Sequence, residues 1–386
     1  MRPQPAGLYL HVPFCRCRCS YCDFAATTEL SLVPAWYQAV CQEVRRWQKD
    51  FSLFDTFYLG GGTPSLLQPS ILIYLFEELR RFFRFTPDAE ITLEANPEDV
   101  FPENLRLWRS LGINRLSLGL QSLEEEDLRF LGRRHTGLVA EKALRTSLEA
   151  GFDCVSVDLI SGLPGQTEKK WERVLTRLEK EKPAHISCYQ LTIKKSTILA
   201  VRKENGERVV AEEKQQEKLF LQTSSWWRKH GYLHYEVSSF AAGERYKSRH
   251  NLKYWRRQPY LGLGPAAHSF SGNRRWWNVA DIRRYCEMIL AGCEAVAGRE
   301  ELTPEQERLE EIFLGLRTAE GVPLHLLSDN PQLERTLSTL QKNRLLSREG
   351  ERIRPTPAGY LFADVLPLWL TGELPVSVLP LSEEMC

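Results

Sequence analysis

The sequence lacks any long hydrophobic run. No stretch reaches the roughly 18–20 consecutive apolar residues that a helix needs to cross a bilayer, which excludes a membrane-spanning protein. It also lacks an excess of charge of one sign, because 51 Lys and Arg residues face 50 Asp and Glu residues and the net charge is +1. A nucleic-acid-binding protein usually carries a strong basic bias, so no nucleic-acid partner is expected. The opening segment MRPQPAGLYLHVPF has too few apolar residues for a signal peptide. We therefore expect a cytoplasmic protein.

Cysteine, by contrast, is concentrated in one place. Four of the ten cysteines lie in HVPFCRCRCSYCDF, residues 11–24. In a reducing compartment, clustered cysteines indicate metal binding or catalysis rather than disulfide bonds. A structural zinc site normally uses four protein ligands in two separated pairs, and no second cysteine pair follows. Cys15, Cys19 and Cys22 form C-x3-C-x2-C, a compact run typical of iron–sulfur clusters. A cubane held by three thiolates leaves one iron open for a small chelating ligand.

The first half of the chain alternates short apolar runs with amphipathic helical segments. This alternation is typical of a parallel sheet covered by helices. Strands are expected at 7–12, 56–61, 90–95, 115–120, 154–159 and 185–191. Six such units approach the eight of a closed barrel without reaching it. We therefore predict an α/β fold with an open partial (β/α)6 barrel over residues 1–200. A doubly wound sheet is the alternative.

Distinctive motifs follow five of these strands. They are the cysteine run, GGGTPS (60–65), EANP (94–97), GLQS (119–122) and DLISGLPGQT (158–167). The carboxyl ends of parallel strands meet at the same edge of a sheet, and binding residues gather there. We therefore expect these motifs to form one site.

The second half is expected to extend the barrel and then form a small domain. The alternation fades after residue 200, and residues 201–298 are interpreted as a barrel extension. Thr303-Pro304 is a plausible start for a helix at 304–316, with further helices expected at 323–328 and 332–345 before a hairpin-like segment. Residues 299–386 therefore resemble a winged-helix-like α+β domain with a tail. Winged helices often bind DNA, but without a basic surplus we expect a lid or a protein-contact module.

These motifs carry a resemblance to a known family. C-x3-C-x2-C with Tyr21 before the last cysteine, followed by GGGTP, resembles the radical S-adenosylmethionine (SAM) superfamily. LYLHVPFC resembles the branch that contains HemN, the oxygen-independent coproporphyrinogen III oxidase, and HemW, described as a heme chaperone. The similarity covers nearly the whole chain, through LEANP, GLQS, LGRRHT, DLISGLPGQT, YEVSSFA, HNLKYW, GLGPAAHSF, FLGLRTAEGV and PTPAGY.

The resemblance implies two cofactors and a set of residues that bind them. Cys15, Cys19 and Cys22 would ligate a [4Fe–4S] cluster, and SAM would bind its open iron. The family's SAM-binding positions correspond to Tyr9, Gly61, Gly62, Thr63, Glu94, Gln121, Arg133 and Asp158. Taken alone, Glu94 and Asp158 would more often be helix caps or members of ion pairs. If SAM is cleaved, an electron donor such as flavodoxin or ferredoxin is implied.

Two departures distinguish the branches. HemN-type oxidases carry a further cysteine two positions after the third ligand, where this sequence has Phe24. They also carry a helical extension before the cluster loop, whereas only 14 residues precede Cys15 here. Both departures favour a HemW-type chaperone that binds heme and transfers it to an acceptor protein. The alternatives are a radical SAM enzyme acting on a tetrapyrrole, either a coproporphyrinogen III oxidase or a HemN-like methyltransferase, and a winged-helix regulator with a redox-sensing cluster. Whether the chain is an enzyme stays open.

The chaperone interpretation requires a heme site. SRHNLKYW (248–255) resembles the HNxxYW motif associated with heme in HemW proteins. A neutral imidazole on His250 could ligate heme iron, and a hydrogen-bonded core histidine is the alternative. Cys17, His268 and a surface histidine are rival ligands. Cys17 lies where the family pattern imposes no ligand, and we expect a spare thiol there.

Overall fold

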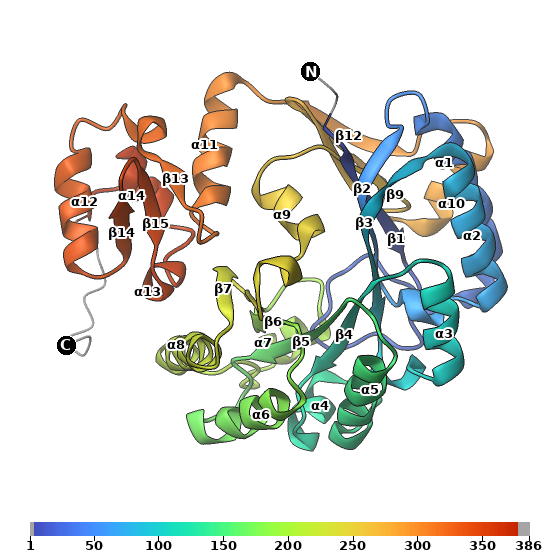
Figure 1. The fold of residues 1–386 in the computed structure, drawn as a ribbon, viewed down its shortest axis with the longest axis horizontal. Coiled ribbons are helices and arrows are strands. Elements are labelled where there is room, and N and C mark those ends of the chain that lie inside the picture. The colour runs from blue at the N-terminus through green and yellow to red at the C-terminus, as the bar shows by residue number, and fades with distance from the viewer. Residues whose placement is uncertain (1–3, 377–386) are drawn as a thin grey trace.

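A run of six parallel strands forms the centre of the computed structural model, which describes residues 4–376 (Figure 1). The strands are β1 (Ala6–Val12), β2 (Leu53–Gly61), β3 (Arg84–Ala95), β4 (Arg115–Gln121), β5 (Cys154–Ser161) and β6 (His185–Gln190). They lie side by side in the order of the chain. A doubly wound sheet would reverse its strand order at a switch point, so the open (β/α)6 barrel is confirmed and the alternative is wrong.

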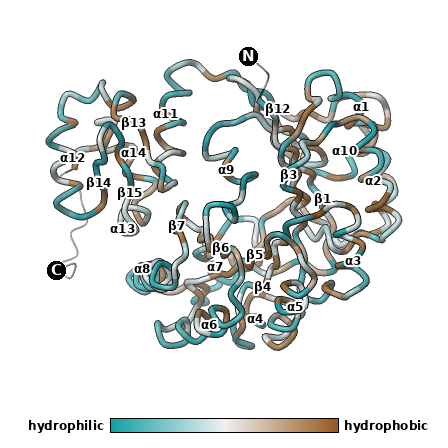
Figure 2. Tube along the Cα trace, in the orientation of Figure 1, coloured by the Kyte–Doolittle hydropathy of each residue, from teal (hydrophilic) through white to brown (hydrophobic). Residues whose placement is uncertain are grey.

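Helices connect these strands and cover the outside of the sheet. They are α1 (Val33–Trp47), α2 (Pro69–Phe82), α3 (Pro102–Ser110), α4 (Glu125–Leu131), α5 (Gly137–Glu149) and α6 (Glu168–Glu181), with short 3-10 helices η1 (Leu30–Leu32), η2 (Pro64–Leu66) and η3 (Pro97–Asp99). Thr136 and Thr167 cap α5 and α6 by accepting backbone N–H bonds. Each helix packs an apolar face on the strands, and Trp36 and Trp171 are fully buried there. In Figure 2 the central strands are largely hydrophobic and the outer helix α8 (Glu213–Lys229) is largely hydrophilic.

The segment after β6 adds strands to both edges of the same sheet. β7 (Leu233–Glu236) and β8 (Ser239–Ala241) extend it beyond β6, and β9 (Tyr260–Leu263), β10 (His268–Ser271), β11 (Arg274–Asn278) and β12 (Val296–Glu301) extend it beyond β1. β9 pairs with β1 in parallel, and the strands beyond it are antiparallel. The remaining elements here are α7 (Ile198–Glu204), η4 (Glu244–Tyr246), α9 (Arg249–Trp255) and α10 (Ile282–Leu290). The sequence predicted an extension but not its place in the sheet.

A buried carboxyl group ties α1 to this extension. Glu43 accepts hydrogen bonds from the Tyr285 hydroxyl (2.6 Å), the Asn278 amide (2.6 Å) and the Gly264 backbone N–H (2.8 Å). Burial raises the pKa of Glu43 to about 7. The carboxyl group of Glu43 therefore joins α1 to α10 and to the turn between β9 and β10.

The last domain has its own hydrophobic core. It contains α11 (Pro304–Gly315), β13 (Val322–Pro323), η5 (Leu324–Leu327), α12 (Leu333–Lys342), β14 (Leu346–Glu349), β15 (Arg352–Pro355), α13 (Pro357–Tyr360) and α14 (Leu366–Thr371). Thr303 and Gln306 form a capping box at the predicted start of α11. The helix expected at 323–328 is only the short η5, and most of the expected tail lies outside the described residues.

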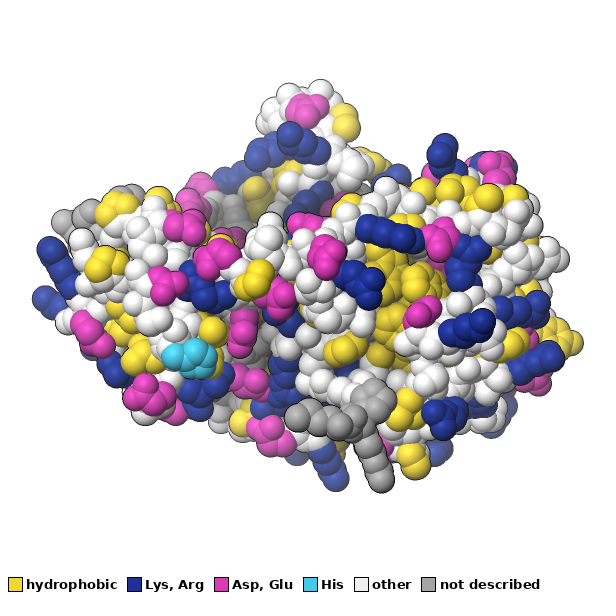
Figure 3. Space-filling view, turned by 90° about the horizontal axis from the view of Figure 1, so that it is seen from above, with side chains coloured by type: hydrophobic (Ala, Val, Ile, Leu, Met, Phe, Trp, Pro, Cys, Tyr) yellow, Lys and Arg dark blue, Asp and Glu magenta, His cyan; other side chains and the backbone are white. Residues whose placement is uncertain are grey.

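Across the described residues, no helix combines the length and the hydropathy that a bilayer span requires. Figure 3 shows Lys and Arg side chains interspersed with Asp and Glu on the face it presents, without a patch of one sign covering it. This mixture accords with the balanced composition.

Candidate functional site

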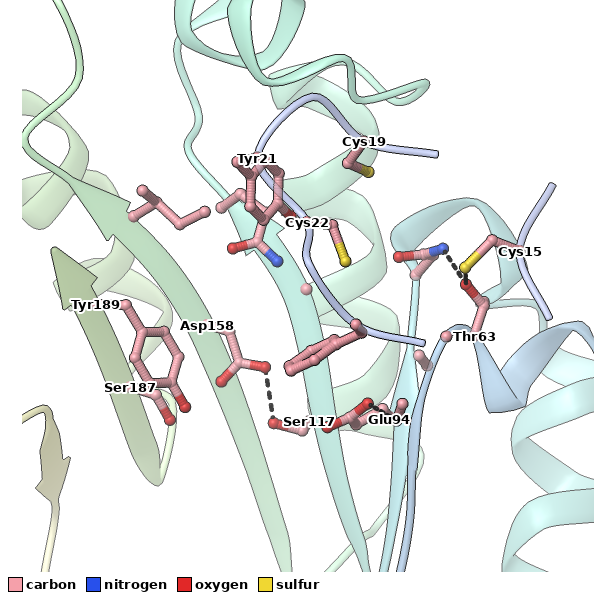
Figure 4. A pocket seen from close by; sticks show the side chains of 18 of the residues that line it. Cys15, Cys19, Tyr21, Cys22, Thr63, Glu94, Ser117, Asp158, Ser187 and Tyr189 are labelled. Carbon is pink, nitrogen blue, oxygen red and sulfur yellow. Dashed lines mark hydrogen bonds between the residues drawn. The ribbon is translucent and has the colours of Figure 1, made fainter. Parts of the chain in front are cut away.

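A cavity of about 380 Å³ opens at the carboxyl ends of the parallel strands (Figure 4). The cysteine loop, residues 13–27, forms one of its walls. Backbone hydrogen bonds from Thr27 to Pro13 (2.7 Å) and from Cys15 to Thr27 (3.0 Å) close the base of this loop. The residues assigned from the sequence that line the cavity are Cys15, Cys19, Cys22, Gly61, Gly62, Thr63, Glu94, Gln121, Arg133 and Asp158. The expectation that the strand-end motifs form one site therefore agrees with the geometry.

The glycines after β2 let the chain pass close to the cysteine loop. A Cβ on Gly62 would lie 2.7 Å from the Phe14 carbonyl oxygen and 2.9 Å from the Phe14 nitrogen. Gly61 has φ +110°, and a Cβ there would lie 2.5 Å from the ring of His11. Only glycine fits such contacts. The family resemblance implied that these glycines contact SAM. The structure shows in addition that larger residues would collide with His11 and with the backbone of Phe14.

A chain of hydrogen bonds joins two of the predicted ligands. The Thr63 hydroxyl donates to the Cys15 sulfur (3.5 Å) and accepts from the Asn96 amide (3.3 Å). Arg133 donates to the Asn96 side-chain oxygen (2.6 Å) and to the Cys19 sulfur (3.6 Å). These donors are Thr63 and Asn96, which follow β2 and β3, and Arg133, which lies between α4 and α5. They supply partial or full positive charge beside sulfurs that become negative when they bind metal.

Two carboxyl groups face the cavity from β3 and β5, the strands on either side of β4. Glu94 accepts from the Tyr58 hydroxyl (2.8 Å) and from the Gly61 backbone (3.0 Å), and Asp158 accepts from the Ser117 hydroxyl (2.9 Å). Burial raises the pKa of Glu94 to about 7 and that of Asp158 to about 6. A bound cation would favour the ionised form of both groups, so the pair suits a positively charged ligand.

Gln121 reaches the cavity through an unusual backbone conformation. Its φ is +64°, in the left-handed region that residues other than glycine seldom adopt, and the pairing of β4 with β5 is irregular at this point. Such conformations persist where the surrounding structure imposes them, often at ligand sites.

Tyr9 lies outside the cavity lining of the described residues. Its hydroxyl donates to Nδ1 of His11 (3.0 Å), and Nε2 of His11 donates to the Ala25 carbonyl (2.7 Å). The ring of Tyr9 stacks on Tyr58 with 6.2 Å between centroids. Tyr9 therefore holds His11, which is bonded to the cysteine loop at Ala25, and packs against Tyr58, which donates to Glu94.

His250 is also outside the lining. It is 1% exposed, and its ring nitrogens are hydrogen-bonded to the Thr56 hydroxyl (2.8 Å) and the Tyr254 hydroxyl (2.8 Å). Burial, together with the charge of Lys253, lowers the pKa of His250 to about 3. Ligation of heme iron by His250 would require one of these bonds to break and the ring to become accessible.

The basic residues of the cysteine loop differ from each other. Arg16 forms an ion pair with Asp99, which is 2% exposed and also accepts from the Ser65 hydroxyl (2.7 Å). Arg18 is exposed and lines the cavity. Arg16 is exposed as well, and its ion pair with Asp99 ties the cysteine loop to η3.

The sequence analysis did not assign a set of polar residues that occupy every second position along the strands. They line the cavity at alternate strand positions, on the face that carries the assigned residues, and are Tyr58, Thr92, Asn96, Arg115, Ser117, Ser156, His185, Ser187 and Tyr189. Alternate residues of a strand point to the same side. Polar residues at alternate positions of otherwise apolar strands were therefore a readable signal.

The donor set fits a polynuclear cluster. In Figure 4 the thiols of Cys15, Cys19 and Cys22 surround a common space above the strand ends. No three His, Cys, Asp or Glu side chains among residues 4–376 are close enough together to hold a single metal ion. Three thiols that line one cavity, two of them accepting hydrogen bonds from Thr63 and Arg133, are a donor set that suits an iron–sulfur cluster.

Comparison with known proteins relates the chain to radical SAM proteins. Residues 9–178 match the model of the radical SAM superfamily, and residues 302–362 match the HemN C-terminal domain. The heme chaperone HemW of Mycobacterium tuberculosis is 35% identical over 380 residues, covering 96% of each chain. HemW of Synechocystis is 33% identical, covering 90% of this chain and 88% of the relative.

A solved structure has the same fold. The coproporphyrinogen III oxidase HemN of Escherichia coli superposes with a TM-score of 0.83 at 22% identity, covering 96% of this chain and 91% of that one. The match spans both the barrel and the last domain.

Proposed function

This chain belongs to the HemW family of the radical SAM superfamily, and from that premise we propose that it binds heme and passes it to an acceptor protein. One observation carries the proposal. The three loop thiols share a single cavity with the strand-end residues of the radical SAM pattern, in a chain that follows the HemW chaperones over nearly its full length. A cytoplasmic location is part of the proposal.

Cys15, Cys19 and Cys22 would hold a [4Fe–4S] cluster. When bound, the cluster and SAM together supply one-electron chemistry at a sulfonium centre. Thr63 and Arg133 donate to two of the thiol sulfurs, which supports a role in offsetting the negative charge of the ligands.

Glu94, Gln121, Arg133 and Asp158 would bind SAM. The two carboxyl groups suit its ammonium group and ribose hydroxyls, and Arg133 suits its carboxylate. Burial favours the neutral form of Glu94 and Asp158 in the protein without ligand, and a bound cation would draw both groups into their charged form. Tyr9 would act indirectly, by holding His11 and Tyr58 in place.

Heme is the cargo, and its acceptor is a protein partner. The names of the related chaperones support this choice of cargo. An electron donor such as flavodoxin or ferredoxin would be a second partner if SAM is cleaved. No nucleic-acid partner is proposed, in keeping with the mixed charges of the surface in Figure 3.

A second candidate is a radical SAM enzyme acting on a tetrapyrrole. One observation favours it. The cavity extends past the assigned SAM residues to a polar floor that includes Arg115, Ser156 and His185. That floor could meet a second molecule beside SAM.

One experiment separates the two candidates. Anaerobically reconstituted protein is titrated with heme, and a second portion is incubated with coproporphyrinogen III, SAM and dithionite. The chaperone predicts heme binding at one per chain, an unchanged porphyrinogen and no accumulation of 5′-deoxyadenosine. Repeated conversion of the porphyrinogen with release of 5′-deoxyadenosine would overturn the chaperone proposal. A Cys15→Ala variant, which lacks one predicted cluster ligand, is the control for cluster-dependent product.

A further inference from the structure

Few histidines of this chain can offer a ring nitrogen to a ligand. Of the eight, His11, His135, His185 and His250 are buried, and both ring nitrogens of His234 are hydrogen-bonded. The histidines that combine exposure with a ring nitrogen free of hydrogen bonds, within the described part of the chain, are His230, His268 and His325. A heme chaperone must load and release its cargo, so an accessible ligand fits the task better than a buried one.

His268 lies on a built aromatic support. It is exposed on β10, and its ring stacks on Trp277 of β11 with 5.8 Å between centroids and 23° between planes. The two residues are direct cross-strand partners. On the next strand Gly298 pairs with Trp277, and a Cβ at Gly298 would lie 2.3 Å from the indole. Because Gly298 has no side chain, the indole of Trp277 can lie against β12 at this position.

His268 can be placed relative to Tyr9 through the sheet pairing, although neither residue lines the cofactor cavity. Phe270 pairs with Tyr260, which sets His268 against Gly262 of β9, and Gly262 pairs with Tyr9 of β1. Paired residues in neighbouring strands point to the same face of a sheet. His268 therefore lies on the face of the sheet that carries Tyr9, two strands away from it.

His230 lacks this placement. It also stacks on a tryptophan, Trp226, at 4.8 Å, but it follows the last residue of α8, a helix on the outside of the barrel. Its Nδ1 donates to the Trp226 carbonyl at 2.8 Å. His325 lies in η5 of the last domain and has no aromatic ring stacked on it among the described residues. His230 is thus a matched control for an exposed histidine on a tryptophan.

We propose that His268, held by Trp277, is the axial ligand of the heme iron. This inference rests on the proposed function and replaces His250 as the ligand. Burial and the nearby charge of Arg275 lower the pKa of His268, so its imidazole is neutral at neutral pH, the form that ligates iron. The exposed edge of the ring lets a planar cargo arrive from and return to solvent.

The test uses the full-length protein, reconstituted with its cluster, and ferric heme as the probe. The parent, His268→Ala, His230→Ala and His250→Ala are titrated with heme and followed by the Soret band and by electron paramagnetic resonance. We expect His268→Ala to lose the parent spectrum and to bind heme more weakly by about tenfold or more, since loss of even an outer partner of a metal ligand has that effect. Adding free imidazole to His268→Gly should restore the parent band. His230→Ala should behave as the parent does.

The outcomes separate this ligand from the proposed function. A parent that binds heme, with an identical spectrum and affinity in His268→Ala, would overturn the ligand and leave the chaperone proposal standing. Loss of the band in His250→Ala, with its retention in His268→Ala, would also overturn it and restore the ligand favoured by the sequence. A parent without any Soret shift would overturn both. Unchanged iron and sulfide contents and melting temperatures across the variants exclude misfolding as the cause.

Discussion

Replacing Gly62 with alanine should disturb the cysteine loop even in protein without cofactors. The new Cβ would lie 2.7–2.9 Å from three backbone atoms, the nitrogen and carbonyl oxygen of Phe14 and the carbonyl oxygen of Val12. Backbone atoms cannot swing aside as a flexible side chain can. Phe14 is fully buried and packs edge-on against Trp36 at 5.6 Å, so the loop cannot retreat.

The magnitude follows from two losses. Overpacking of this kind costs about 1–3 kcal/mol. The hydrogen bond from Gly62 N–H to the Val12 carbonyl (2.8 Å) would stretch, which costs roughly 1 kcal/mol more. We expect the free energy of unfolding to fall by about 2–4 kcal/mol. In a domain of this size, each kcal/mol lowers the melting temperature by on the order of 2 °C.

The assay is thermal unfolding of the cluster-free protein, followed by iron and sulfide analysis after reconstitution. Gly243→Ala is the matched control, because Gly243 has an extended φ of 171° and the nearest atom to its Cβ position is 3.9 Å away. A Gly62→Ala protein that melts with the parent and takes up a full cluster would refute the packing argument. The glycine would then matter only for the approach of a cofactor.

The remaining predictions concern the thiols and the buried carboxyl group. Cys15→Ala should lose the cluster's iron, whereas Cys17→Ala should keep the iron content and absorption spectrum of the parent; equal retention in both would sink the ligand assignment. Glu43 has a folded-state pKa of about 7 against an ordinary value near 4.5, so the folded state favours its protonated form. The stability that the protonated Glu43 contributes is therefore present at low pH and declines as the pH rises toward 7. Over this range the free energy of unfolding should fall by up to about 3 kcal/mol. Glu43→Gln should remove this slope in urea titrations at several pH values, and an unchanged slope would contradict the pKa.

Much of the site was readable because parallel strands end at one edge. That rule brings Cys15, Thr63, Glu94 and Asp158 to one cavity from loops far apart in the sequence. It needs only the strand positions and the motifs that follow them. It does not report the register between strands or the side to which a residue points.

Tyr9 and His250 show where this reasoning stops. Both lie in motifs of the family pattern, yet each directs its polar atoms to neighbours inside the protein. Those partners, among them His11 and Thr56, are set by the pairing of β1 with β2 and by the docking of α9, which no local pattern encodes. Ser117 and Ser187 were missed for a different reason, since single serines in apolar strands carry little weight until the period of two is counted across several strands.

The extension strands were hidden by their length. β7 to β11 contain three to five residues each, too short for alternation to separate them from loops. Their place on both edges of the sheet follows from contacts between β9 and β1 and between β8 and β6, which are distant in the sequence. The stacked pair His268 and Trp277 depends on the register between the short strands β10 and β11.

Heme transfer is the most direct measurement of the central claim. The cluster-loaded protein would be charged with one heme per chain and mixed anaerobically with an immobilised apo-form of a heme protein, beside free heme at the same concentration. The account predicts that heme moves to the acceptor faster or more completely than from free solution, with the porphyrin mass unchanged and the protein left able to bind heme again. Heme that stays on the protein, or that reaches the acceptor no better than free heme, would contradict it.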